Sequence, residues 1–220
     1  MSIESDSVRP AIGSQWIKAN AIGGAINLAV TFAAFVVGSV LGVSEAGTSA
    51  VLKGGFVIVA AAMLTFGLFV LGYLSGVVLR TKLPAFPMRG WLALYVVLGA
   101  IFGLISAYAW LTPETPEDID PIDTDIVLGL ALGAAIAGVA ISAAVGSLQA
   151  LILRPAAVGL GLWIGCCAIA GVLFALIVPA VIYGPQSGFA QEFVIELVTL
   201  AVTILAAVIL VPAVNRLRPR

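Results

Sequence analysis

Two carboxylic acids stand close to an apolar run near the end of the chain. Glu192 and Glu196 in QEFVIELVTL are four residues apart, so they share one face of a helix, and no basic residue is beside them. A helix dipole stabilises an acid in the first turn, which accounts for Glu192 without a function. Glu196 lies a turn deeper. An acid within a membrane is expensive and by default suggests a proton or cation site.

Neutral polar side chains form a second candidate group. Asn20, Asn27 and Thr31 are spaced by 7 and 4 residues, so they also share one helical face. This stripe either lines a polar path or meets polar residues of another helix, such as Gln149. Hydrogen bonds between membrane helices contribute about 0.6 kcal/mol each and are common, so we interpret the stripe as packing.

The types of residue that are absent exclude most kinds of chemistry. The sequence contains no histidine, which excludes histidine-ligated haem, histidine-zinc sites and Ser-His catalysis. It has neither a phosphate-binding glycine loop nor a basic face large enough for nucleic acid. Cys166 and Cys167 are adjacent and point in different directions, so we expect buried small side chains there. We therefore expect no enzyme activity, no cofactor and no metal site.

The composition places these residues in a membrane protein. Hydrophobic residues make up 62% of the 220 residues, charged residues only 10%, and the mean hydropathy is +1.20. Soluble domains carry about 25% charged residues. A membrane-spanning helix needs about 20 apolar residues. Six stretches are long enough: 19–42, 54–79, 91–111, 126–153, 160–183 and 192–213. We expect a single all-α transmembrane domain over residues 1–220.

The basic residues predict the orientation of this domain. The expected spans put nine of the ten Lys and Arg residues on one side and only Lys53 on the other. Basic residues concentrate on the cytoplasmic side of a membrane, so both termini are expected there. The loop over residues 112–125 carries six acids and three prolines and no base, and we expect it to be a solvated outer loop.

The spacing of tryptophan, glycine and Leu-Arg pairs indicates an internal repeat. A glycine follows Trp16, Trp91 and Trp163 at the same distance of eight residues, and Leu-Arg pairs end the helices that come next. We therefore predict three tandem helical hairpins, over 16–80, 91–154 and 163–218. The alternative is that tryptophan and arginine only mark the membrane interface.

One copy of this pattern carries a resemblance to a known set of proteins. The pattern G-x-x-Q-x-x-x-L-R, then a loop and Trp, comprises Gly146, Gln149, Leu153, Arg154 and Trp163. It resembles uncharacterised bacterial multi-pass proteins that repeat Gln-Trp-x-x-Leu-Arg before a Trp-led helix. Ala150 replaces their Trp, and the earlier copy has Ser75 and Gly76. The resemblance covers residues 72–175, implies a bacterial membrane protein and supplies no activity.

Small residues at four-residue intervals indicate where helices approach closely. Gly129, Gly133 and Ala137 form such a ridge on the fourth predicted helix. In lipid, a ridge of this kind lets two backbones pack against each other. We expect it at the centre of the bundle or at an interface with a partner.

These patterns favour a non-catalytic subunit or scaffold of the bacterial cytoplasmic membrane. It would pack against lipids, other membrane proteins or a second copy. The alternative is a small transporter or substrate-binding component, supported by the repeat, the stripe on the first helix and Glu196. If it is a packing subunit, Glu196 should lie in the outer headgroup region or meet a partner chain.

Overall fold

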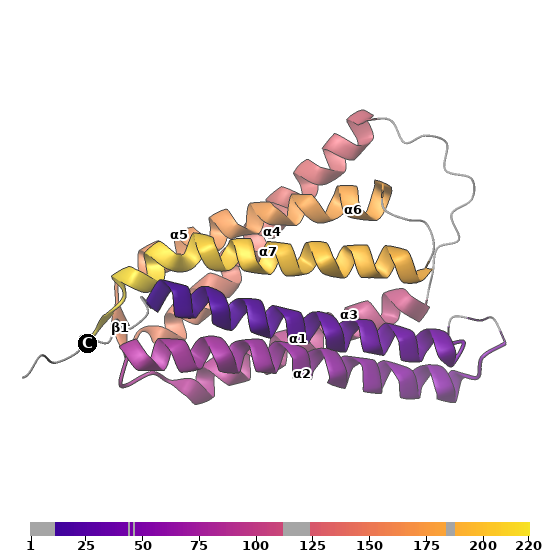
Figure 1. Cartoon of the computed structure of the whole chain (residues 1–220), viewed down its shortest axis with the longest axis horizontal. Helices are drawn as coiled ribbons and strands as arrows, with labels where there is room; N and C mark the ends of the chain where they lie inside the picture. Colours follow the sequence, from indigo (N-terminus) through magenta and orange to yellow (C-terminus); the bar gives the residue numbers. More distant parts are fainter. Residues whose placement is uncertain (1–11, 44, 46, 112–123, 184–187) are drawn as a thin grey trace, which may run out of the picture.

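The chain folds into long helices that run back and forth along one direction (Figure 1). The computed structural model describes residues 12–43, 45, 47–111, 124–183 and 188–220. Its helices are α1 (Ile12–Val40), α2 (Ala50–Lys82), α3 (Met88–Leu111), α4 (Thr124–Leu153), α5 (Leu160–Gly171), the 3-10 helix η1 (Val172–Leu176), α6 (Ile177–Tyr183) and α7 (Gly188–Arg216).

Six of the resulting spans are long and apolar enough to cross a membrane. The fifth is formed jointly by α5, η1 and α6, and each of the others is a single helix. The predicted all-α polytopic membrane protein is therefore confirmed at this level. Most of the acidic outer loop, residues 112–123, lies outside the described residues, and Asp125 lies in the first turn of α4.

The fifth span tightens in its middle, which the hydropathy did not predict. The 3-10 stretch Val172–Leu176 follows Gly171 and precedes Pro179. Proline has no backbone N–H, so Pro179 cannot donate to the carbonyl four residues earlier, that of Ala175. A short stretch of i to i+3 bonds accommodates this loss without ending the span.

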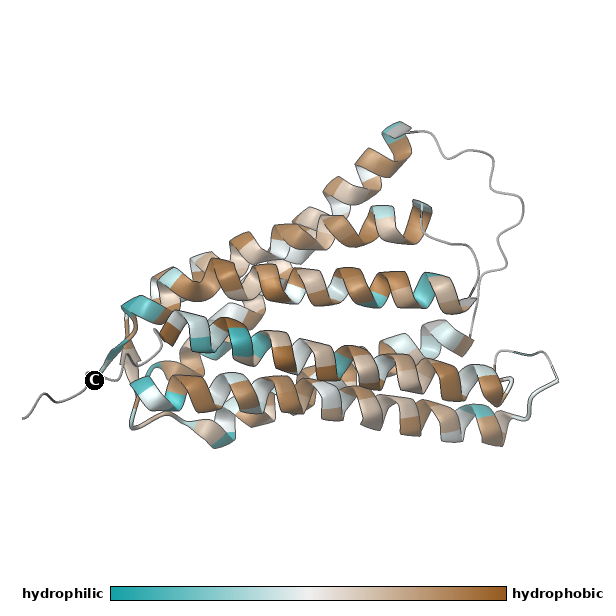
Figure 2. Cartoon of the chain, in the orientation of Figure 1, coloured by the Kyte–Doolittle hydropathy of each residue, from teal (hydrophilic) through white to brown (hydrophobic). Residues whose placement is uncertain are grey.

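Hydrophilic residues lie mainly near the helix ends (Figure 2). The C-terminal ends of α2, α4 and α7 and the N-terminal ends of α1, α3 and α5 lie at the same end of the bundle. That end carries every described Lys and Arg except Lys53, and we call it the basic end. The grouping of basic residues that the sequence predicted is therefore present in the fold.

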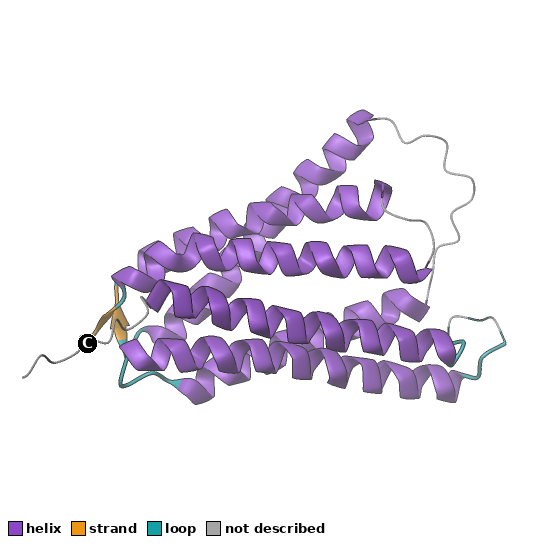
Figure 3. Ribbon diagram, in the orientation of Figure 1, coloured by secondary structure: helices purple, strands orange, loops and turns teal. Residues whose placement is uncertain are grey.

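A small antiparallel sheet closes the basic end (Figure 3). Strand β1 (Ala157–Val158) follows α4, and strand β2 (Arg218–Pro219) follows α7. The amide of Arg220 also donates to the carbonyl of Ala156 over 3.2 Å. This pairing joins the second and third predicted hairpins, and two-residue strands leave too short a pattern to be predicted.

The helices lie in an order around the bundle that leaves one weak junction. Helix α2 packs against α1 and α3, α7 packs against α1 and α5, and α4 packs against α5 and η1. Helices α3 and α4 make few contacts, and the first turns of α4 diverge from the other helices (Figure 1).

The glycines that follow each tryptophan by eight residues all lie at close helix crossings. A Cβ on Gly99 would lie 2.7 Å from the Cα of Thr65 on α2, and one on Gly24 would lie 3.0 Å from Leu200 on α7. A Cβ on Gly171 would overlap the carbonyl of Gly138 on α4. The crossings at Gly99 and Gly171 need glycine because the backbone of the neighbouring helix occupies the space of a side chain, whereas at Gly24 only the end of the Leu200 side chain would have to shift.

Candidate functional site

Three tryptophans from different predicted hairpins meet inside the basic end. The ring centroids of Trp16 and Trp163 are 5.7 Å apart, and those of Trp91 and Trp163 are 6.1 Å apart, both edge to face. Their exposed fractions are 2%, 0% and 1% for Trp16, Trp91 and Trp163. Residues of an interfacial belt face the headgroups, so these buried rings do not form one.

Gln149 of α4 binds two of the surrounding aromatic residues. Its side-chain oxygen accepts a hydrogen bond of 3.0 Å from Nε1 of Trp163 on α5. Its side-chain nitrogen lies 3.5 Å from the hydroxyl of Tyr95 on α3, and the thiol of Cys167 lies 3.9 Å from its oxygen. Because Gln149 is largely buried, these partners provide most of the hydrogen bonds that water would otherwise make.

Trp91 finds its acceptor on the backbone of α2. Its Nε1 donates to the carbonyl of Gly72 over 2.9 Å, and the hydroxyl of Ser75 donates to the same carbonyl over 3.1 Å. A Cβ on Gly72 would overlap the ring of Tyr95. Glycine at this position therefore lets the aromatic residues of α3 reach the backbone of α2.

Trp16 differs from the other two tryptophans. Its Nε1 is buried and has no acceptor among the residues that the structure describes. Its backbone carbonyl accepts a hydrogen bond of 2.9 Å from the side-chain nitrogen of Asn20, one turn further along α1. A buried N–H without an acceptor costs about 1–3 kcal/mol relative to a paired one.

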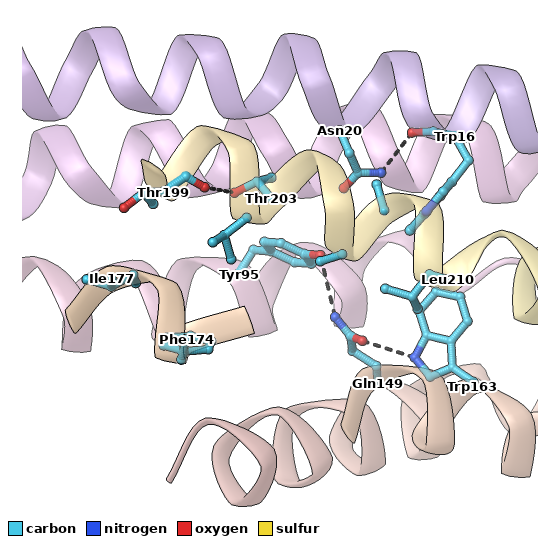
Figure 4. A pocket seen from close by; sticks show the side chains of 13 residues that line it. Trp16, Asn20, Tyr95, Gln149, Trp163, Phe174, Ile177, Thr199, Thr203 and Leu210 are labelled. Carbon is cyan, nitrogen blue, oxygen red and sulfur yellow. Dashed lines mark hydrogen bonds between the residues drawn. The ribbon is translucent and has the colours of Figure 1, made fainter. Parts of the chain in front are cut away.

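A cavity of about 260 Å³ lies beside these groups (Figure 4). Its wall combines the polar side chains of Asn20, Tyr95, Gln149, Thr199 and Thr203 with aromatic and aliphatic ones. The hydroxyls of the two threonines donate to carbonyls of their own helix, each over 2.9 Å, and keep oxygen lone pairs available. The remaining lining residues are Trp16, Trp163, Phe174, Ile177, Val202, Ala206, Ala207 and Leu210.

The polar stripe predicted on the first helix is divided between two places. Asn20 lines the cavity together with Gln149. Asn27 instead packs against α2, where a Cβ on Gly67 would lie 2.5 Å from its side-chain oxygen, which has no donor among the described residues. The hydroxyl of Thr31 donates to the carbonyl of Asn27 over 2.9 Å. Only Asn20 of these three residues therefore belongs to the cavity.

The two acids of α7 lie further from the basic end than the cavity does. Glu196 is 8% exposed, and its spacing to Thr199 and Thr203 places all three on one helical face. Glu192 is partly buried and accepts a hydrogen bond from the side chain of Trp110 on α3. Neither acid lines the cavity. This chain already buries Glu196, so little of its side chain is open to a partner, and its expected position in the outer headgroup region stays a prediction.

The small-residue ridge of α4 does not lie at the centre of the bundle. Gly129, Gly133 and Ala137 are exposed, and an added Cβ at either glycine would meet no described atom within 4 Å. The close crossing of α4 is made by Gly138 instead. Of the two places expected for the ridge, the centre of the bundle is therefore wrong, and a partner interface stays a prediction.

The sequence contained a signal for Tyr95, which lines the cavity but was not predicted as a site residue. Tyr95, Asn20 and Cys167 each follow a tryptophan of the repeat by four residues, so they occupy equivalent positions. An alignment of the three predicted hairpins would have put Tyr95 at the position equivalent to that of Asn20. Thr199 and Thr203 carry no such signal, because threonine is common in apolar helices.

The described residues of the site offer neutral hydrogen-bonding groups. Both cysteines are buried and free, as small apolar residues would be. Within the described ranges, no three His, Cys, Asp or Glu side chains lie close enough together to bind a metal. No protein-family model, curated protein or solved structure matches the chain.

Proposed function

We propose that the protein binds a small molecule inside its helical bundle, as a small transporter or a substrate-binding component of the bacterial cytoplasmic membrane. The observation that carries this proposal is the cavity that Asn20 and Gln149 share, although they come from different hairpins. Polar side chains that line a cavity inside a membrane bundle can form hydrogen bonds with a molecule that enters it.

Three tandem hairpins arranged in a cycle are the second part of the proposal. The glycines that follow each tryptophan pack against the second helix of the preceding hairpin, which for the first hairpin is the last one. These pairs are Gly99 with Thr65, Gly171 with Gly138, and Gly24 with Leu200. Hairpins that follow one another often pack together, so it is the third pair, between the first hairpin and the last, that supports copies of one unit about a central axis.

The weak junction between α3 and α4 is the place where we propose that the bundle opens to admit the ligand. These two helices form the second hairpin, yet they make few contacts and separate away from the basic end. The grouping of basic residues supports a cytoplasmic position for that end and for both termini. The ligand would then enter from the outer side or from the outer leaflet.

A non-catalytic subunit or scaffold is the second candidate function. The exposed ridge of Gly129, Gly133 and Ala137 on α4 favours it, because such a surface accepts another helix closely. The two functions are compatible, since a binding component can also belong to a larger membrane complex.

Ligand binding is tested by thermal unfolding of the purified chain in the presence of small neutral, anionic and cationic solutes. A ligand that binds only the folded state raises the melting temperature with its concentration. We expect such protection in the natural protein and its loss in Asn20→Leu, which removes the amide from the cavity. The matched control is Asn27→Leu, on the same helix but outside the cavity. The proposal fails if no solute protects, or if both variants lose protection equally.

A further inference from the structure

We propose that the ligand of the cavity is an uncharged molecule whose oxygen accepts a hydrogen bond from Nε1 of Trp16. This inference rests on the proposed function and specifies the class of ligand. Trp16 is 2% exposed, lines the cavity and has no acceptor within the described part of the chain. Figure 4 shows its ring pointing into the space between Asn20 and Trp163.

The comparison of the three hairpins explains why Trp16 lacks an acceptor. Residues five positions before the arginine of each Leu-Arg pair are Ser75, Gln149 and Ala213, and all three are buried. Gln149 accepts directly from Trp163. In the cyclic order, Ala213 of α7 stands in the same relation to Trp16 as Gln149 does to Trp163. Ala213 and Trp16 belong to one buried cluster. The methyl group of alanine accepts no hydrogen bond.

The backbone route that serves Trp91 is also closed to Trp16. Trp91 reaches a carbonyl of α2 because Gly72 has no side chain there. Eight positions before the arginine, the third hairpin has Leu210 instead of glycine. The side chain of Leu210 lines the cavity, beside Trp163 (Figure 4), and no glycine opens the backbone of α7 at this position. The cavity therefore lies where the third hairpin departs from the other two.

The remaining lining defines the ligand as small and uncharged. The lining residues include no Lys, Arg, Asp or Glu, so a charged group would enter without a counter-charge. Donors and acceptors are both available, from Asn20 and Gln149, beside aromatic and aliphatic walls. The volume of about 260 Å³ is below the roughly 300–1,000 Å³ of pockets that hold drug-sized ligands. A short amide or alcohol has the required chemistry.

The indole N–H signals of the four tryptophans in a ¹⁵N-labelled full-length sample test the inference. Trp16→Phe identifies the signal of Trp16. Acetamide, acetate and acetamidinium serve as probes because they have similar shapes and different charges. We expect acetamide to move the Trp16 signal downfield in a saturable manner and the two ions to leave it in place. An unmoved Trp16 signal in saturating acetamide, or an equal response to the ions, overturns the inference.

Two substitutions at Ala213 test the comparison between hairpins. Ala213→Gln should supply the missing acceptor through its side-chain oxygen. It should therefore move the Trp16 signal downfield without a probe and abolish the response to acetamide. Ala213→Leu adds a large side chain that has no acceptor, and it should not move the Trp16 signal downfield. If Ala213→Gln also leaves the Trp16 signal in place, the assigned position is wrong. If Ala213→Gln does not fold, the response of the Gln149 side-chain amide signal to acetamide is measured in Trp16→Phe instead. Loss of this response supports the role of Trp16, and an unchanged response refutes it.

The results separate this inference from the proposed function. Acetamide that moves the amide signal of Gln149 but not the indole signal of Trp16 would leave a ligand site in the bundle and refute the role of Trp16. A screen in which no solute of any charge protects the fold or moves any of these signals would refute both.

Discussion

Gly138 of α4 and Gly171 of α5 face each other so closely that a methyl group added to either would overlap the backbone of the other. The two backbones can approach only because both residues lack a side chain. In lipid, where apolar surface gains nothing from leaving the solvent, this kind of contact holds helices together. Gly133, five residues earlier on α4, has no described atom within 4 Å of an added Cβ.

The first prediction compares these two glycines. Gly138→Ala should lower the free energy of unfolding by about 1–3 kcal/mol, because its methyl group has no space. Gly133→Ala should leave it unchanged or raise it by up to about 1 kcal/mol, because alanine favours the helix more than glycine does. Thermal unfolding of both variants in one detergent measures the difference. Equal losses would show that the crossing of α4 and α5 is not where the structure places it.

Hydropathy predicted which segments span the membrane but not which face of each helix points inward. The six spans are long apolar runs, so their number and approximate ends follow from the sequence. In a soluble helix the buried face is the apolar one, whereas here both faces are apolar. Gly129 and Gly133 therefore look like packing positions in the sequence, although Gly138 makes the contact.

The candidate site was predictable only in part for the same reason. Asn20 and Gln149 stand out in an apolar sequence, and both line the cavity. Asn27 stands out equally but packs against Gly67, because its place depends on the helix it meets. The burial of Glu196 depends likewise on how α7 packs against its neighbours.

The second prediction concerns the exposed ridge of α4. If the ridge binds a partner, Gly133→Leu should leave the unfolding temperature of the isolated chain almost unchanged and reduce the size of the complex extracted in mild detergent. Its control is Leu130→Ile, at an exposed position with little change in volume. Size-exclusion chromatography with light scattering measures the complex. An unchanged size for both variants would argue that this face only contacts lipid.

The third prediction tests the orientation of the bundle. Single cysteines at Thr81 and Thr124, in a background with Cys166→Ala and Cys167→Ala, should lie on opposite sides of the membrane. In intact cells an impermeant thiol reagent should label residue 124 and spare residue 81, which lies at the basic end. Labelling of residue 81 alone would reverse the orientation, and equal labelling of both would contradict six spans.

The last prediction concerns the hydrogen bonds of the tryptophan cluster. Gln149→Leu leaves Nε1 of Trp163 buried without its acceptor and should lower the free energy of unfolding by about 1–3 kcal/mol. Ser75→Ala should cost only about 0.5–1.5 kcal/mol, because the carbonyl of Gly72 keeps its bond from Trp91.

A double-mutant cycle distinguishes the lost bond from a change of packing. Adding Trp163→Phe to Gln149→Leu removes donor and acceptor together, so the double variant should lose less than the sum of the two single losses. Denaturation of all three variants in the same micelles supplies the numbers. Strict additivity would mean that the two side chains do not interact and that Gln149 acts only through its volume.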